Sequence, residues 1–538
     1  MDRSGKLVAG RALPALRRQG RATQLIVDGK PLVMIGGELH NSSSSSLRYM
    51  EPIWPRLRAL HCNTVLAAVS WELVEPEEGR FELELVTGLV EAARSHGLKL
   101  VPLWFGTLKN SFSQYAPAWV KTDVRRFPRA KAQQGFRRGA NSVFSAETLA
   151  CDARAFARVM KHIREIDAEH QTVVMVQVEN EVGILEQTRD YCAEAEAAFA
   201  KPVPAELMRY LRGHLEGLRG ELCGAWEAAG SREAGTWTEV FGATGDEVFM
   251  AWHMGKFVDA VAAAGAKEYA LPMFANAWLT GTPPGKAGVY PSGGPVSRMM
   301  DVWKAAAPHL FTLAPDNYDE EPFADACADY AREDNPLLIP EARRDHHAPA
   351  CVWYALAEHD AMCFAPFGID SVGLDDPAIV NIVQEGIAGQ NATGNSRLLT
   401  QSFRVLNDMM PTIAKHHGSG NMIGILQREG QKSITRTLGG YVLTIEFNEE
   451  RKPGVAPAGG LAIATGKDEF LVAGHGFRVR FAVDGKTGYW VENLAIDECV
   501  FVEGQLTCLR RLNGDEGGVR LRTREVEVCR AKLHPLAV

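Results

Sequence analysis

The sequence lacks several features that would place it in well-defined classes of protein. None of its ten cysteines forms a CxxC pair, which argues against a zinc site of the usual spacing and against a disulfide framework. No apolar run reaches the roughly 20 residues of a membrane span. The basic first 22 residues contain no apolar segment of the signal-peptide type. The sequence as given therefore predicts a cytoplasmic protein, or a periplasmic one if a leader has been removed.

The chain also lacks an excess of positive charge. Its formal net charge is −8 and its pI is about 6.1, which disfavours nucleic acid and anionic membranes as partners. Its 538 residues, 46% of them hydrophobic, predict a globular protein of roughly two to four domains. His346 and His347 are adjacent but have no third ligand at metal spacing, so neither a metal nor a cofactor is expected. A homo-oligomer is left open.

The sequence does contain a short hydrophobic run that ends in acids. In QTVVMVQVENEVG, residues 171–183, the apolar residues 173–176 are followed by Gln177 and by Glu179-Asn180-Glu181. A run this short and β-branched predicts a strand buried on both faces, as in a parallel sheet. Parallel strands with acids at their carboxyl ends build the active sites of (β/α)8 barrels. The alternative is that these acids are only the solvated start of a loop.

A second run of the same kind is NPLLIPEARRDHH, residues 335–347. Its apolar residues 337–339 predict a strand, and Glu341 stands at the end of that strand. Two glutamates at strand ends are the pair that glycoside cleavage requires, one to protonate the leaving oxygen and one to attack the anomeric carbon. Glu181 and Glu341 can meet only if a barrel or a sheet brings both strand ends to one mouth.

These stretches resemble a known family. QVENEVG is similar to the QxENEYG signature of the glycoside hydrolase family 35 β-galactosidases, and residues 47–83 resemble that family's W…RL…GLNTV…WNLHEPxxGxFxF. The matching positions, in order, are Asn63-Thr64-Val65, Trp71, Glu75-Pro76, Gly79 and Phe81. The similarity covers most of residues 23–390, and the barrel also resembles family 42.

The resemblance implies a retaining β-galactosidase that acts on a galactoside or a galactosylated oligosaccharide. It makes Glu181 the acid/base and Glu341 the nucleophile. Asn180 would bind the sugar 2-hydroxyl, and Tyr318 would hold Glu341 in its rotamer. Two motifs depart from the family pattern, because Asn41 replaces the expected tyrosine and residues 104–110 replace CAEW. The residues predicted to bind substrate are Glu38, Trp71, Glu72, Trp104, Lys109, Asn180, Asn276 and Tyr318.

Several alternatives stay open. Spacing alone does not separate Glu179 from Glu181 as the acid, and only the resemblance selects Glu181. The other enzyme interpretations are an exo-β-glycosidase of the same clan, such as an arabinopyranosidase, a fucosidase or a glucosidase. A non-catalytic carbohydrate-binding barrel would normally have lost one of the two glutamates, and both are present.

The order of patterns along the chain predicts an α/β fold, a (β/α)8 TIM barrel followed by a C-terminal antiparallel β-sandwich. The expected parts are an N-terminal tail (1–22), the barrel (23–418) with a helical insertion (184–267), and the sandwich (419–538). Local signals include a hairpin turn at Asp28-Gly29, a helix over 146–167, and a capping box at Thr244 and Glu247. Another turn is expected at Asn513-Gly514 in the sandwich. The long loop 105–143 is interpreted as functional, with a structural cover as the alternative.

Overall fold

The computed structural model describes residues 12–133, 135–319, 321–373, 396–452, 454–485 and 488–537. The chain divides into two compact units. One is made mainly of Asn41–Pro52 and Leu66–Asp316, and the other of Leu16–His40, Ile53–Val65 and Asn317–Val538. Within the described ranges, no helix is both long enough and apolar enough to cross a membrane.

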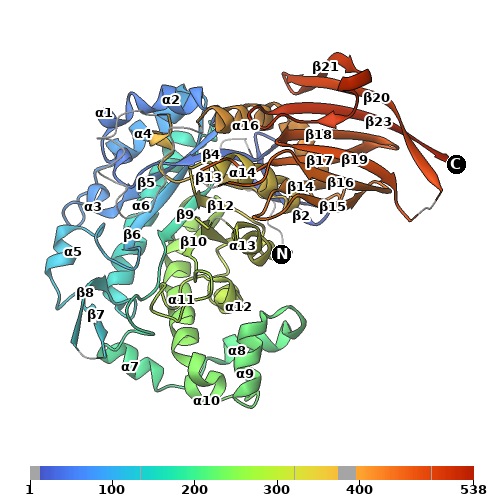
Figure 1. The fold of residues 1–538 in the computed structure, drawn as a ribbon. Helices are drawn as coiled ribbons and strands as arrows, with labels where there is room; N and C mark the ends of the chain where they lie inside the picture. Colours follow the sequence, from blue (N-terminus) through green and yellow to red (C-terminus); the bar gives the residue numbers. More distant parts are fainter. Residues whose placement is uncertain are drawn as a thin grey trace. The chain divides into compact units, whose positions relative to one another are not determined.

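Eight strands form one closed barrel, which confirms the predicted fold class. Around the barrel the order is β4-β5-β6-β9-β10-β11-β12-β13 (Figure 1), and β13 pairs in parallel with β4. The strands are β4 (Met34–Glu38), β5 (Thr64–Ser70), β6 (Lys99–Lys109), β9 (Val176–Asn180), β10 (Met273–Trp278), β11 (Thr312–Asn317), β12 (Ile339–Ala342) and β13 (Cys363–Pro366).

The barrel strands are nearly continuous buried runs, as parallel strands covered on both faces require. Every residue of β5 is buried, and so is every residue of β6 after its first. The fourth strand begins later than its sequence predicted, at Val176 instead of Val173. Val173 forms only an isolated parallel bridge with Leu100, so the apolar run starts before the regular ladder does.

Helices and short turns connect these strands. The predicted helix 146–167 is confirmed as α6 (Ala146–Asp167), where the Ser145 side chain accepts a hydrogen bond from the backbone N–H of Thr148. The other helices that connect or follow barrel strands are α1 (Leu47–Met50), α2 (Ile53–Ala59), α3 (Trp71–Val74), α4 (Glu84–Ser95), α12 (Met300–Ala306), α13 (Phe323–Tyr330), α14 (Ala348–Glu358), α16 (Ser396–Asp408) and α17 (Met410–His416).

Between β9 and β10 the chain is mainly helical, and its longest helix, α11, packs against α6. The predicted capping box is wrong, because it forms at Thr236 and Glu239 instead of Thr244 and Glu247. Glu247 is buried and pairs with Arg298, so its carboxylate does not bond the helix end. The helices are α7 (Ala193–Phe199), α8 (Ala205–Gly213), α9 (Gly220–Ala228), α10 (Trp237–Phe241) and α11 (Gly245–Glu268).

Two segments expected to be irregular contain regular structure. In the predicted tail, β1 (Ala15–Gln19) joins β2 (Ala22–Val27) and β3 (Lys30–Leu32) in a small sheet, while residues 1–11 lie outside the described ranges. The turn at Asp28-Gly29 is confirmed, and both residues have positive φ. The long loop 105–143 contains the end of β6, α5 (Ala118–Thr122) and the hairpin of β7 (Arg129–Ala132) and β8 (Gly135–Asn141).

The C-terminal strands form the predicted antiparallel sandwich. One sheet has the order β14-β17-β18-β23-β20-β21 and the other β15-β16-β19-β22, and both contribute to a shared apolar core. The strands are β14 (Met422–Leu426), β15 (Ser433–Leu438), β16 (Tyr441–Phe447), β17 (Gly459–Gly466), β18 (Glu469–His475), β19 (Phe477–Val483), β20 (Tyr489–Val502), β21 (Gln505–Leu512), β22 (Val519–Arg520) and β23 (Glu527–Ala537).

Two features of this domain are the connection between β21 and β22 and the packing of β17 on α14. Asn513-Gly514 leads into a single 3-10 turn that connects β21 and β22, and because these strands belong to different sheets, the turn does not close a hairpin. Strand β17 packs on α14 so closely that a Cβ on Gly459 would lie 2.4 Å from the Cα of Ala350. The domain limits 23–418 and 419–538 remain a proposal.

Candidate active site

The acidic end of β9 has an unusual backbone. Glu179 has a φ of 59° and Glu181 a φ of 43°, a left-handed conformation that non-glycine residues rarely adopt. Such residues cluster at functional sites when the surroundings hold them in place. The regular alternation of side chains between the two faces of a strand is therefore lost here. The side chains of the two glutamates lie in different environments.

Glu179 points into a buried polar cluster. Its carboxylate accepts hydrogen bonds from the backbone N–H groups of Thr107, at 3.2 Å, and Leu108, at 2.6 Å. The neighbouring Asp152 of α6 accepts from the Trp104 indole at 2.8 Å and from the Thr107 hydroxyl at 2.5 Å. Glu179 and Asp152 have no exposed surface, so this arrangement disfavours Glu179 as the acid that meets a substrate.

The pKa values of both buried carboxyl groups are raised. Burial raises the pKa of Glu179 well above its usual value, and the charge of Asp152 raises it further. Burial also raises the pKa of Asp152, but hydrogen bonds from Glu179, Thr107 and Trp104 oppose that rise. These directions favour a protonated Glu179 that shares its proton with Asp152.

Asn180 and Lys109 come together as neighbours on adjacent strands. The Lys109 ammonium donates to the Asn180 side-chain oxygen at 2.8 Å and lies 5.0 Å from the centre of the Phe105 ring. Both side chains are buried. The hydrogen bond from Lys109 fixes the orientation of the Asn180 amide.

Glu181 is held by a network that runs through β10 and β11. Its backbone N–H donates to the side-chain oxygen of Asn276 at 3.0 Å, and the Asn276 amide donates to Asp316 at 2.7 Å. One carboxylate oxygen of Asp316 lies within 4.8 Å of one of Glu181. Asn276, which the sequence predicted to bind substrate, thus bonds the backbone N–H of Glu181 and the carboxylate of Asp316. Asp316 was missed by sequence reasoning, although its place at the end of an apolar run was the available signal.

Glu341 has its own support in the second unit. The Tyr318 hydroxyl donates to the Glu341 carboxylate at 2.6 Å, the contact that the sequence led us to expect. Arg343 donates to the backbone carbonyl of Tyr318 at 3.3 Å, which ties the segment after β11 to the segment after β12. Glu341 is 4% exposed, so the carboxylate is sheltered and oriented.

The predicted aromatic contacts are mostly structural. Trp71 and Trp104 have at most 1% exposed surface, and their indole N–H groups donate to Glu75 and Asp152 respectively. Trp278, at the end of β10, is 41% exposed.

The two remaining residues predicted to bind substrate, Glu72 and Glu38, lie in different environments. Glu72 is partly exposed and pairs with Lys121 at 2.9 Å. Glu38 is fully buried at the end of β4.

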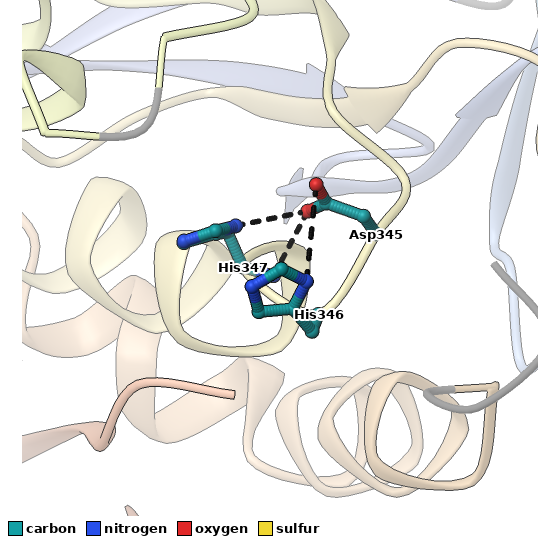
Figure 2. Close-up of side chains that lie close together, drawn as sticks. All are labelled: Asp345, His346 and His347. Atoms are coloured by element: carbon teal, nitrogen blue, oxygen red, sulfur yellow. Dashed lines mark hydrogen bonds and ion pairs between the residues drawn. The ribbon is translucent and has the colours of Figure 1, made fainter. Parts of the chain in front are cut away.

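The histidine pair is sheltered from solvent, since His347 is 3% exposed and His346 is partly buried. Both imidazole rings turn toward the Asp345 carboxylate (Figure 2). His347 Nδ1 lies 3.2 Å from one carboxylate oxygen, and His346 Nδ1 lies 4.0 Å from the other. By proximity these three side chains could hold a metal ion.

The charges around Asp345 oppose a metal at this place. Arg343 forms an ion pair with the carboxylate, and Arg451 of the sandwich bonds His347 Nε2 at 2.6 Å. Burial by itself would raise the pKa of Asp345, but hydrogen bonds from His347 and Arg343 hold it well below its usual value. The two guanidinium groups already bind Asp345 and His347, and their positive charge disfavours a further cation beside them. The cluster is better explained as a link between the loop after β12 and the sandwich.

Sequence comparisons match two regions of the chain. A family model described as β-galactosidase, glycoside hydrolase family 42, matches residues 46–241. A model described as a domain of unknown function (DUF5597) matches residues 399–523. A curated β-galactosidase from Xanthomonas manihotis is 28% identical over 198 residues, which are 35% of this chain and 30% of that protein. The chain thus matches less than a third of the length of this curated relative.

Solved structures with a similar fold include two β-galactosidases. The enzyme from Bacillus circulans sp. alkalophilus is 13% identical, with a TM-score of 0.46 over 71% of this chain and 57% of that one. The enzyme from the psychrophilic Marinomonas ef1 is 15% identical, with a TM-score of 0.46 over 71% of this chain and 60% of that one. Likeness at this level does not bear on function.

The region that matches the family model includes Glu181 and its neighbours, whereas Glu341 lies beyond it. Over residues 46–241, the chain is therefore similar to the β-galactosidases of glycoside hydrolase family 42, which confirms the family resemblance seen in its sequence.

Proposed function

We propose that this protein is a retaining β-galactosidase that uses Glu181 and Glu341 to remove terminal β-galactosyl residues. The observation that carries the proposal is the placement of both glutamates at the carboxyl ends of parallel strands, β9 and β12, of one closed barrel. In barrels of this kind the carboxyl ends of the strands form the active-site face. Each glutamate also has its own hydrogen-bonded support.

The proposed reaction has two steps. Glu341, oriented by the Tyr318 hydroxyl, attacks the anomeric carbon while Glu181 gives its proton to the departing oxygen. Water then attacks the galactosyl-enzyme, with Glu181 acting as the base. Asn276 fixes the backbone of Glu181, which keeps the acid in position through both steps.

Asn180 is the proposed contact to the sugar 2-hydroxyl. Lys109 fixes the orientation of the amide by donating a hydrogen bond to its oxygen, and this orientation suits a contact between Asn180 and the hydroxyl. Hydrogen bonds to this position strengthen in the transition state and contribute to rate. The neighbouring Glu179 serves as a buried support for the strand end and takes no part in proton transfer.

The galactoside specificity rests on the family match over residues 46–241 and on the named relative. The proposed substrate is a galactoside or a galactosylated oligosaccharide. A panel of nitrophenyl glycosides at equal concentration tests this choice, and we expect the β-galactoside to be hydrolysed fastest. Faster turnover of the β-glucoside, β-fucoside or α-arabinoside would assign the enzyme to that sugar instead.

The roles of the two glutamates are tested by substitution and azide rescue. Glu181→Ala should lose most activity on alkyl galactosides but keep the first step on an activated aryl galactoside, because a phenolate leaves without a proton. Azide should then yield the β-galactosyl azide. Glu341→Ala should be nearly inactive on both substrates and yield only the α-azide, because azide would attack from the nucleophile's face.

The configuration of the azide product, read by NMR, decides the assignment. Exchanged configurations would mean that the roles are reversed. Full activity of either variant would place the catalytic pair elsewhere. Glu165→Gln, an exposed glutamate on α6, is the control and should behave as the parent protein.

A further inference from the structure

The C-terminal sandwich contains a cavity that the proposed reaction does not use. Its volume is about 580 Å³, within the range of roughly 300–1,000 Å³ typical of small-ligand sites. It is lined by parts of β19, β20 and β22 together with the turn that precedes β22. All of its walls come from one domain, so the cavity depends on the sandwich alone.

The walls of the cavity carry an excess of positive charge. Arg478, Arg480 and Arg520 line it, whereas the chain as a whole has a net charge of −8. Arg478 and Arg480 share one carboxylate, that of Glu446, at 2.5 and 3.2 Å. Arg520 forms no ion pair with any residue that the structure describes. The described lining residues include three arginines and no acid, which favours an anionic ligand, and guanidinium groups bind carboxylate and sulfate groups through paired hydrogen bonds.

Two large aromatic side chains stand beside these arginines. Trp490 is 62% exposed and Tyr489 is 41% exposed, and both line the cavity. The Trp490 indole N–H donates to Glu492 at 3.3 Å, which restrains the ring. The C–H faces of a sugar ring are apolar and pack on such rings, while the ring substituents stay polar. Aromatic rings beside arginines therefore suit a sugar that bears negative charge.

The floor of the cavity offers backbone polar groups as well. Strand β22 has two residues and pairs only with Arg478 and Val479 of β19. On that side, β19 has no strand partner over residues 480–482 among the described residues. Backbone N–H and C=O groups on this side of the strand can bond the hydroxyl groups of a ligand.

We propose that this cavity binds an acidic oligosaccharide. Its sugar rings pack on Trp490 and Tyr489, and its carboxylate or sulfate groups pair with Arg520 and with the two arginines of β19. The site is distinct from the proposed catalytic glutamates and does not depend on the activity assigned to them. It gives the domain a role in holding charged glycan chains.

Calorimetric titration of the full chain tests the proposal with four probes at low salt. They are a trigalacturonate, a sulfated galactotriose, a neutral galactotriose and hexaglutamate. We expect one or both of the acidic sugars to bind at least about 10-fold more tightly than the neutral sugar. Whichever of the two acidic sugars binds more tightly identifies the preferred anionic group as carboxylate or sulfate. Hexaglutamate, which carries charge without sugar rings, should bind more weakly than the better acidic sugar.

Variants locate the binding site. Arg520→Gln and Trp490→Ala should each weaken the acidic sugar about 5- to 10-fold. Arg510→Gln, an exposed arginine of β21 that does not line the cavity, is the matched control and should bind as the parent does. All three should keep the parent's hydrolysis of an aryl galactoside. Equal binding of the neutral sugar or of hexaglutamate, unchanged binding by Arg520→Gln, or no binding of either acidic sugar would each overturn the proposal.

Discussion

At the scale of single residues, the most informative feature is the separation of two glutamates that are two positions apart. Glu181 is anchored through its backbone to Asn276, whereas the Glu179 carboxylate bonds the backbone of β6. The left-handed conformations of both residues allow this divergence. The same residue type is thus the proposed acid/base at one position and a buried support of the strand end at the other.

The buried pair of Glu179 and Asp152 makes stability depend on pH. The folded pKa of Glu179 is raised above its usual 4.5, so the protonated pair is favourable at low pH. Its contribution is lost as the pH rises through the folded pKa, with a slope of at most about 1.4 kcal/mol per pH unit. Glu179→Gln resembles the protonated form and cannot ionise.

We therefore expect Glu179→Gln to lose less stability than the parent as the pH rises. Urea unfolding midpoints measured from about pH 5 to about pH 9 would show the difference. Glu165→Gln, on the exposed face of α6, should keep the parent's pH dependence. A parallel pH dependence in Glu179→Gln and the parent would contradict the shared proton.

At the scale of elements, three neighbouring strands position the proposed acid. The amide of Asn276, on β10, connects the backbone at the end of β9 to Asp316 of β11. Because hydrogen-bonded side chains on rigid strands hold a catalytic group in place, the effect of Asn276 should appear mainly in the step that needs the acid.

Asn276→Ala should lower kcat on alkyl galactosides by about 10- to 100-fold, because the acid loses its orientation. The loss on a dinitrophenyl galactoside should be much smaller, since that leaving group needs no proton. Steady-state kinetics on the two substrates give the comparison. Asn335→Ala, a buried asparagine that bonds the backbone of Tyr330, controls for general destabilisation. Equal losses on both substrates would instead make Asn276 a direct contact to the sugar.

The elements themselves could largely be predicted from the sequence, because their signals are local. Apolar β-branched runs marked the barrel strands, and helical periodicity marked α6 to the residue. The arrangement of the candidate site was harder to predict from the sequence. Asp152 lies on a helix and its partner Glu179 on a strand 27 positions later, so their shared proton has no signal in either segment. The contact of Arg451 with His347 likewise depends on how the sandwich packs.

At the scale of the whole molecule, the sandwich is part of the same compact unit as the last strands of the barrel. Gly459 of β17 lies directly against α14, and an added Cβ would lie 2.5 Å from the Cβ of Ala350. Glycine is thus required at this position for space, and the contact tests whether the two layers depend on each other.

Gly459→Ala should destabilise the protein by about 1–3 kcal/mol, because a packed interface cannot accommodate an extra methyl group without shifting. Gly466→Ala, at the other end of the same strand, meets no atom closer than 4.0 Å and is the matched control. Differential scanning calorimetry should show a lower Tm for the first variant and an unchanged Tm for the second. Equal Tm values would mean that the sandwich moves freely against α14.

The pairing of β4 with β13 has a consequence for synthesis on the ribosome. The first barrel strand is made early, but the strand that completes its pairing emerges roughly 300 residues later, or about 15–60 s at typical elongation rates. During that interval the edge of β4 is open to wrong partners. Translation speed and chaperone capture in that interval should therefore influence the yield of active protein more than any property of the finished fold.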